Sequence, residues 1–176
     1  VGIYELDPAR GWRCVERRPG LRLVTPLVNA ATRQRFAALR AELAPGLDWL
    51  CVDSAAEDAL PAADVVLTAS GTATLEALLV GRPMVVGYRV NALTYWTARL
   101  LRLVRVPYIA MSNLLAGEGL APEFVQGECS PANLAGAVDG FLDAPSRCAA
   151  IRARYRELAA GLRRDTSREA AAAVLG

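Results

Sequence analysis

The sequence contains no histidine and no lysine, and both absences limit what the chain can do. Without imidazole the usual general base near neutral pH is missing, so acid–base chemistry would fall to carboxylates, cysteine or tyrosine. All 20 basic residues are arginine, which indicates biased codon usage rather than a choice of guanidinium chemistry at every site. Acidic residues are interspersed and the net charge is only +2, so the concentrated basic face of a nucleic-acid-binding domain is absent. We therefore expect no nucleic-acid partner.

The cysteines and the hydrophobic runs exclude further classes of protein. Four cysteines are scattered without any CxxC pair, and no histidine could complete a zinc ligand set, so we expect neither a metal ion nor another cofactor. The start of the chain lacks the charged and apolar regions of a signal peptide, and no run reaches the roughly 20 apolar residues that span a bilayer. These features favour a soluble protein of a reducing compartment, with free thiols.

Strand-like and helix-like segments alternate along the 176 residues, which are enough for one domain with a sizeable core. Apolar runs predict strands at 21–28, 47–52, 65–69, 84–88 and 108–111. Helices are predicted between them at 32–43, 55–60, 73–80 and 92–104, and a helical tail at 131–142, 146–162 and 167–175. Such alternation predicts an α/β fold with a doubly wound parallel sheet and helices on both faces.

The segment 69–89, ASGTATLEALLVGRPMVVGYR, combines a buried strand, a turn of small residues, a helix and a second strand. Ser70, Gly71 and Thr72 would let a ligand phosphate approach backbone N–H groups at the start of the helix, where the helix dipole favours an anion. Glu76 lies in the expected first turn of this otherwise apolar helix, where one carboxylate could bind a ligand hydroxyl. Together these residues outline a nucleotide-sugar site.

Structural roles explain the same residues about as well. Ser70 or Thr72 could cap the helix, and Glu76 could complement the helix dipole. Gly81 and Pro83 are ordinary punctuation, because glycine ends a helix and proline prevents its continuation. Both interpretations stay open at the level of sequence.

Three loops follow predicted strands, and we expect them to meet at one edge of the sheet. They are 70–72, 88–91 and 112–113. Ligands of parallel sheets bind beyond the carboxyl ends of the strands. This edge is therefore the expected ligand site.

Two arginine-rich helices allow two interpretations each. A core-packed helix with a solvated basic face is the first, and contact with an anionic membrane surface is the second. In the segment NALTYWTARLLRLVRV, which contains the predicted helix 92–104, Arg99, Arg102 and Arg105 share one side. The predicted helix 146–162 carries Arg147, Arg152, Arg154 and Arg156.

Longer motifs carry a resemblance. ASGTATLEALLVGRPMVVGYRV is followed by NALTYW, by Pro107-Tyr108-Ile109 and by MSNLLAG at 111–117. VTPLVN precedes them, and residues 126–131 and a terminal AAAAVLG follow. SGTATLE, MVVGYR and NLLAG in this order are specific together, whereas a lone SGT would be weak. From Leu21 to its end the chain resembles the C-terminal domain of the lipid-A-disaccharide synthases, which are glycosyltransferases of the GT-B fold.

This resemblance implies a reaction and a location. Family members transfer 2,3-diacylglucosamine from its UDP derivative to 2,3-diacylglucosamine 1-phosphate, and form lipid A disaccharide 1-phosphate and UDP without a metal ion. The implied partners are a UDP-diacylglucosamine donor, a lipid acceptor and a peripheral membrane contact. The implied location is cytoplasmic, on the inner face of the inner membrane.

The resemblance also implies roles for single residues. Glu76 matches the carboxylate expected at the ribose hydroxyls, and Asn113 matches the asparagine beside the nucleotide. Ser70, Gly71 and Thr72 match the turn near the pyrophosphate. Because no metal is implied, the charge on departing UDP needs a cation, and Arg89 is the nearest candidate, with a structural ion pair as its other interpretation.

The chain departs from the family pattern at its start. Family members begin with a separate N-terminal domain that binds the acceptor and supplies the proposed base, so we expect no catalytic residue in this sequence. The family's Gly-Ser-Arg segment is missing before Leu21, and residues 1–20 indicate an altered reading frame or a misassigned start. Residues 21–176 would form the UDP-sugar-binding Rossmann-like domain.

Different functions follow from these departures. The chain could be one part of a split synthase with a separately encoded N-terminal domain, or a non-catalytic remnant that retains a partial UDP site. A third reading, an N-acetylglucosamine transferase or UDP-sugar epimerase, is disfavoured by the NLLAG and GYR segments. Uncovered apolar surface and unpaired edge strands would favour a homo-oligomer.

Overall fold

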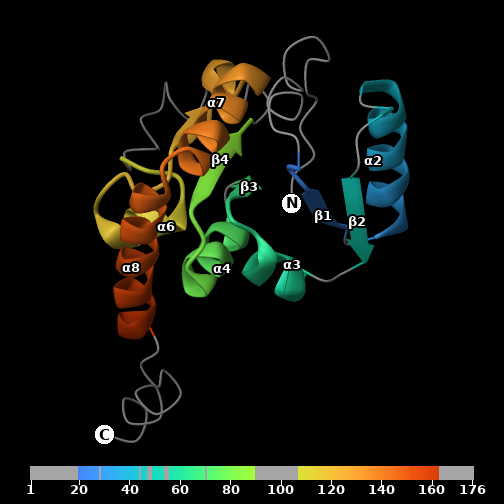
Figure 1. The fold of residues 1–176 in the computed structure, drawn as a ribbon. Helices are drawn as coiled ribbons and strands as arrows, with labels where there is room; N and C mark the ends of the chain where they lie inside the picture. The colour runs from blue at the N-terminus through green and yellow to red at the C-terminus, as the bar shows by residue number, and fades with distance from the viewer. Residues whose placement is uncertain are drawn as a thin grey trace, which may run out of the picture.

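The computed structural model describes residues 20–27, 29–43, 45–46, 49–53, 56–69, 71–89 and 107–162. Its described strands pair in parallel and alternate with helices, which confirms the α/β class (Figure 1). One sheet pairs β1 (Leu23–Leu27) with β2 (Trp49–Asp53). The other has the order β3 (Val66–Thr68), β4 (Met84–Tyr88), β5 (Glu123–Val125).

The described strands form two separate parallel sheets. The common doubly wound order is 3-2-1-4-5-6, in which the first strand joins the two halves. The observed pairs β2-β1 and β3-β4-β5 correspond to strands 3-2 and 4-5-6 of that order. Among the described residues, no strand pairs with the second edge of β1 or of β3.

We expect the isolated chain to self-associate through such an edge, because unpaired strands offer backbone groups to other chains. Leu67 on β3 is 44% exposed, and Leu67→Lys should shift the mass measured by size exclusion with light scattering toward the monomer. Leu79→Lys is the matched control, since Leu79 is 42% exposed but lies on a helix. A wild-type chain that is monomeric at micromolar concentration would contradict the prediction.

The first βαβ unit is held by a cap and an aromatic contact. Helix α2 (Ala30–Leu43) begins after Asn29, whose side-chain Oδ1 accepts a hydrogen bond from the backbone N–H of Thr32 at 2.8 Å. The indole N–H of Trp49 donates to Thr25 Oγ1 at 2.8 Å, and the Trp49 ring packs edge-on against Phe36 with 4.9 Å between ring centroids. These contacts bind β1, β2 and α2 together.

The second unit contains helices α3 (Ala56–Ala62) and α4 (Thr72–Val80). Gly81 adopts the left-handed conformation at the end of α4, where its N–H donates to Leu78 O and the Arg82 N–H donates to Ala77 O. The Arg82 guanidinium donates to the Pro61 carbonyl of α3. The predicted punctuation at Gly81 and Pro83 is therefore confirmed, and β4 begins and ends where the sequence predicts.

The strand predicted at 108–111 is wrong. These residues form bends that lead into helix α6 (Met111–Ala116). The Glu123 carboxylate accepts hydrogen bonds from the backbone N–H groups of Ile109 and Ala110. These two N–H groups are therefore not available for hydrogen bonds to a neighbouring strand. The strand that pairs with β4 in this sheet is instead β5, which the sequence pattern did not predict.

The last described part is helical, as predicted. A 3₁₀ turn η1 (Gln126–Glu128) leads to α7 (Pro131–Leu142), whose bounds match the prediction, and to α8 (Pro145–Leu162). Ser130 caps α7 by accepting from the Asn133 N–H at 3.2 Å, and Pro131 occupies the first turn. The predicted helices 92–104 and 167–175 and the segment 1–19 lie outside the described residues.

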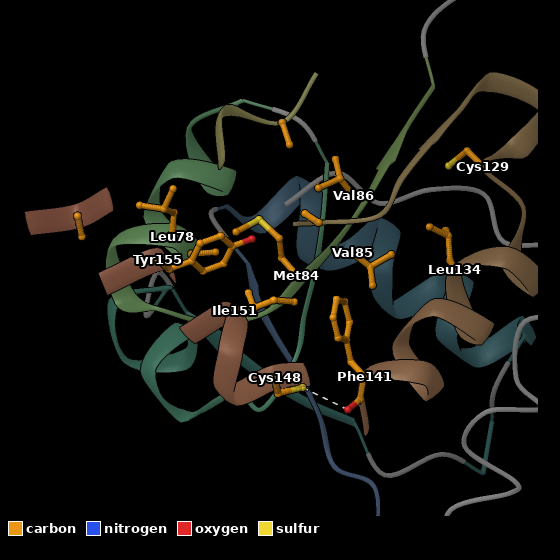
Figure 2. Packing of buried hydrophobic residues seen from close by; sticks show 14 residues of the cluster. Leu78, Met84, Val85, Val86, Cys129, Leu134, Phe141, Cys148, Ile151 and Tyr155 are labelled. Carbon is orange, nitrogen blue, oxygen red and sulfur yellow. Dashed lines mark hydrogen bonds between the residues drawn. The ribbon is translucent and has the colours of Figure 1, made fainter. Parts of the chain in front are cut away.

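The core lies between β4 and the two long C-terminal helices (Figure 2). Met84, Val85 and Val86 of β4 are almost fully buried, and Phe141 and Tyr155 are the largest side chains packed in this core. The Cys148 thiol donates to the Phe141 carbonyl at 3.2 Å, the contact drawn in Figure 2. Three cysteines, Cys51, Cys129 and Cys148, carry free thiols, while Cys14 lies outside the described residues.

The burial of the Tyr155 hydroxyl leads us to expect a loss of stability at high pH. Its hydroxyl is buried and has no hydrogen-bond partner in the described part of the chain. Burial raises the pKa of Tyr155 to about 12, and the neighbouring Ser112 side chain acts in the opposite direction. An unfolded tyrosine ionises near pH 10, so between pH 10 and 12 the folded chain binds more protons than the unfolded chain. The free energy of unfolding therefore falls as the pH rises through that window, by about 2–3 kcal/mol in total.

Tyr155→Phe should remove this component. The phenylalanine variant should have about the stability of wild type at pH 8, because the buried hydroxyl has the Ser112 side chain near it but makes no hydrogen bond of normal geometry to a described residue. Urea unfolding of both proteins at pH 8 and pH 11 measures the difference. Equal losses of stability in the two proteins would contradict the assignment.

The arginines of α8 are engaged within the protein. Arg154 pairs with Glu118 at 2.9 Å and Glu157 at 3.0 Å, and these partners raise the pKa of the guanidinium. Arg147 lies 4.7 Å over the Phe141 ring, and Arg152 approaches Asp64 at 4.0 Å. This arrangement favours the first interpretation of α8, a core-packed helix with a solvated face.

Within the described ranges, no helix has the length and apolar character needed to cross a membrane.

Candidate functional site

Loops gather at the carboxyl edge of the three-stranded sheet. Thr68 pairs with Val86, and Tyr88 pairs with Val125, so the chain leaves β3, β4 and β5 at the same end. The first described residues beyond these strands are Ala69, Arg89 and Gln126, and Gly71 follows Ala69 by two positions. The described parts of the loops after β3 and β4 therefore begin at one edge, as predicted, and the loop after β5 begins there too.

Gly71 forms the turn between β3 and α4 in a conformation reserved for glycine. Its φ is 104° and its ψ is −151°, and it occupies the N-cap position of α4 without any side-chain cap. The Thr74 hydroxyl donates to the Gly71 carbonyl at 2.7 Å and accepts the Met111 N–H at 3.1 Å. The suggestion that Thr72 caps the helix is wrong, because Thr72 is already inside α4, and Ser70 lies outside the described residues.

The exposed start of α4 leaves room for a ligand. Gly71 and Thr72 are exposed, while Thr74, Ala77 and Leu78 are buried on one face of the helix. Glu76 lies on the exposed face, and it stands in the second turn rather than the first because α4 begins at Thr72. A first-turn role of Glu76 in complementing the dipole is therefore not supported, since that effect fades beyond the first turn.

Arg89 is exposed immediately after β4. None of the ion pairs among the described residues involves Arg89, so the structural ion pair considered for it finds no partner there. Its positive charge acts on the Cys129 thiol, whose pKa is raised by burial and lowered in smaller measure by Arg89. The guanidinium therefore lies near the turn that follows β5.

Asn113 is placed differently from the prediction. It was expected on an edge loop with Ser112, but both residues are buried in α6, and Asn113 is only 1% exposed. Its Nδ2 donates to Ala121 O and to Glu123 Oε1, each at 2.7 Å, and its Oδ1 accepts the Ala121 N–H at 2.8 Å. The amide thus fixes the chain that enters β5, and contact between Asn113 and a nucleotide stays a prediction.

Three residues near the edge were missed by reading the sequence. Thr74 links the α4 turn to α6, Glu123 holds the segment before α6, and Gln126 starts the turn after β5. Glu123 and Gln126 stand in the short segment PEFVQGE, whose polar residues between apolar ones were a usable signal. Thr74 has no such signal, because its role depends on a partner 37 positions away.

Parallel strands joined by helices, with loops gathered beyond their carboxyl ends, define the class of Rossmann-like α/β domains. The family model described as lipid-A-disaccharide synthetase matches residues 13–175. Because this match takes in most of the chain, the chain belongs to the lipid-A-disaccharide synthetase family.

Curated relatives agree with this assignment. The chain is 44% identical over 160 residues to a lipid-A-disaccharide synthase of Yersinia pseudotuberculosis, an alignment that takes in 91% of this chain and 40% of the relative. It is 46% identical over 166 residues to that of Xanthomonas oryzae pv. oryzae, with 94% of this chain and 38% of the relative aligned. The chain therefore spans about two fifths of the length of these relatives.

Proposed function

We propose that this chain is the donor-nucleotide part of a lipid A disaccharide synthase and binds UDP at the carboxyl edge of β3 and β4. The reaction of the whole enzyme transfers 2,3-diacylglucosamine from its UDP derivative to 2,3-diacylglucosamine 1-phosphate, with release of UDP. The observation that carries the proposal is the glycine-only turn at Gly71, which opens the N-terminus of α4 at this edge.

The proposed roles follow from the positions of the side chains. The backbone N–H groups at the exposed residues Gly71 and Thr72 suit a diphosphate, because they combine hydrogen-bond donors with the positive end of the α4 dipole. Glu76, one turn further along the exposed face, suits the ribose hydroxyls, because these can donate hydrogen bonds to its carboxylate. Ser70 is proposed for the same turn on family grounds.

Arg89 is proposed to stabilise the leaving group. As the acceptor hydroxyl forms its bond to the anomeric carbon, the bond from that carbon to the β-phosphate oxygen breaks and its electrons remain on UDP. A guanidinium beside the diphosphate offsets this growing charge. The proton of the acceptor hydroxyl goes to a base that we place in the family's N-terminal domain, which also binds the lipid acceptor at the inner face of the inner membrane.

Calorimetric titration with UDP tests the proposal. The folded chain should show saturable binding, and Glu76→Ala should weaken it about 10- to 100-fold, because hydrogen bonds to a charged carboxylate are lost. Glu157→Ala is the matched control, since Glu157 is an exposed helical carboxylate on α8. A folded sample that does not bind UDP would favour the non-catalytic remnant.

A further inference from the structure

Gln126 has an unusual backbone conformation at the edge of the sheet. Its φ is 51°, and no other described residue except glycine has a positive φ. Glutamine is disfavoured in this left-handed region, because its Cβ crowds the backbone. The next residue, Gly127, could adopt the conformation without strain, yet its φ is not positive. Strain of this kind persists where the surrounding structure enforces it, and it concentrates at binding sites.

The turn that carries Gln126 is fixed to the sheet. The Gln126 carbonyl accepts the Cys129 N–H at 3.1 Å, which closes η1. Cys129 and Leu134 in turn pack so closely on β4 that a Cβ built on Gly87 would lie 3.0 Å from Cys129 Sγ and 3.1 Å from a Leu134 methyl carbon. Figure 2 shows Cys129 and Leu134 at the end of the core where this turn attaches. The half-buried Gln126 side chain thus starts from a rigid position.

Register brings this turn beside the proposed site. Val125 is the partner of Tyr88, so Gln126 and Arg89 are the first residues beyond two paired strands. The sheet order is β3-β4-β5, which puts Gly71, Arg89 and Gln126 in sequence across the carboxyl edge. If the uridine of the donor lies at α4 and its diphosphate lies at Gly71 and Arg89, the group that reaches Gln126 is the donor sugar.

We propose that the Gln126 amide hydrogen-bonds the hydroxyl or amide groups of the donor sugar, a role that rests on the proposed function. An uncharged amide both donates and accepts, which matches a sugar hydroxyl without adding charge beside the diphosphate. Gln126 is thereby a specificity residue: it recognises the sugar and contributes little to the binding of UDP itself.

Two variants separate the side chain from the backbone. Gln126→Gly removes the amide and relieves the left-handed strain at the same position, and its Tm shows whether the variant folds. Gln126→Met keeps the strain and the approximate shape but removes the amide. Glu128→Gln is the control, because Glu128 is exposed in the same turn. UDP and UDP-N-acetylglucosamine are the probes, titrated into the full chain.

The two probes identify the contact. We expect both Gln126 variants to bind UDP-N-acetylglucosamine about five- to tenfold more weakly and UDP within about twofold of wild type, with Glu128→Gln unchanged for both. Unchanged affinity for the sugar nucleotide in either variant would overturn the proposal, and so would equal losses for both probes, which would place the contact on the nucleotide. A folded wild type that does not bind UDP would overturn the proposed function and this role with it.

Discussion

Replacing Glu123 with alanine is expected to lower the free energy of unfolding by about 3 kcal/mol and the Tm by about 6–12 °C. Glu123 Oε2 accepts the Ile109 N–H at 2.7 Å, and Oε1 accepts the Ala110 N–H at 3.0 Å and the Asn113 side-chain amide at 2.7 Å. Each bond involves a charged acceptor, and the backbone donors at half-buried Ile109 and buried Ala110 lose their partner once the carboxylate is gone.

The effect should extend to the candidate site. The segment held by Glu123 leads into α6, and the Met111 N–H at its start bonds the Thr74 hydroxyl, which also holds the Gly71 carbonyl. Thermal unfolding monitored by circular dichroism measures the loss. Glu118→Ala serves as the control, because that carboxylate is exposed and its ion pair with Arg154 contributes little. Similar Tm values for the two variants would refute the assigned role.

Gly71→Ala is expected to cost about 2–3 kcal/mol and to weaken UDP binding at least about tenfold. The conformation at φ 104° and ψ −151° is open only to glycine, so alanine must rearrange the turn that precedes α4. A Cβ at Gly71 would meet nothing within 4 Å, so the cost comes from the backbone and not from a clash. The rearranged turn would withdraw the N–H groups proposed to hold the diphosphate.

Gly117→Ala is the matched control for this experiment. Gly117 ends α6 at φ 69° and ψ 11°, an ordinary left-handed conformation that alanine adopts at a cost of about 1 kcal/mol. A Cβ there would also meet open space. Denaturant unfolding and UDP titration of both variants measure the contrast, and a Gly71→Ala variant that resembles Gly117→Ala in both would show that the turn is not specialised.

Local patterns predicted much of the fold. The apolar run 84–88 lies between proline and arginine, and the Ser130-Pro131 pair marks the start of α7, so both elements were predicted with their observed bounds. The run 108–111 is equally apolar but became bends and the start of α6. A short apolar run does not distinguish a strand from other buried segments, and a carboxylate at Glu123 decided this case.

The sequence by itself determined the α/β alternation, the small-residue turn before α4 and the exposed carboxylate at Glu76, because these depend on residue types a few positions apart. Only the tertiary structure decided that the described strands divide into two sheets, that Asn113 is buried against Ala121 and Glu123, and that Gln126 stands beside Arg89. These features depend on which strands pair and which distant donors meet which acceptors, and neither periodicity nor local propensity specifies such partners.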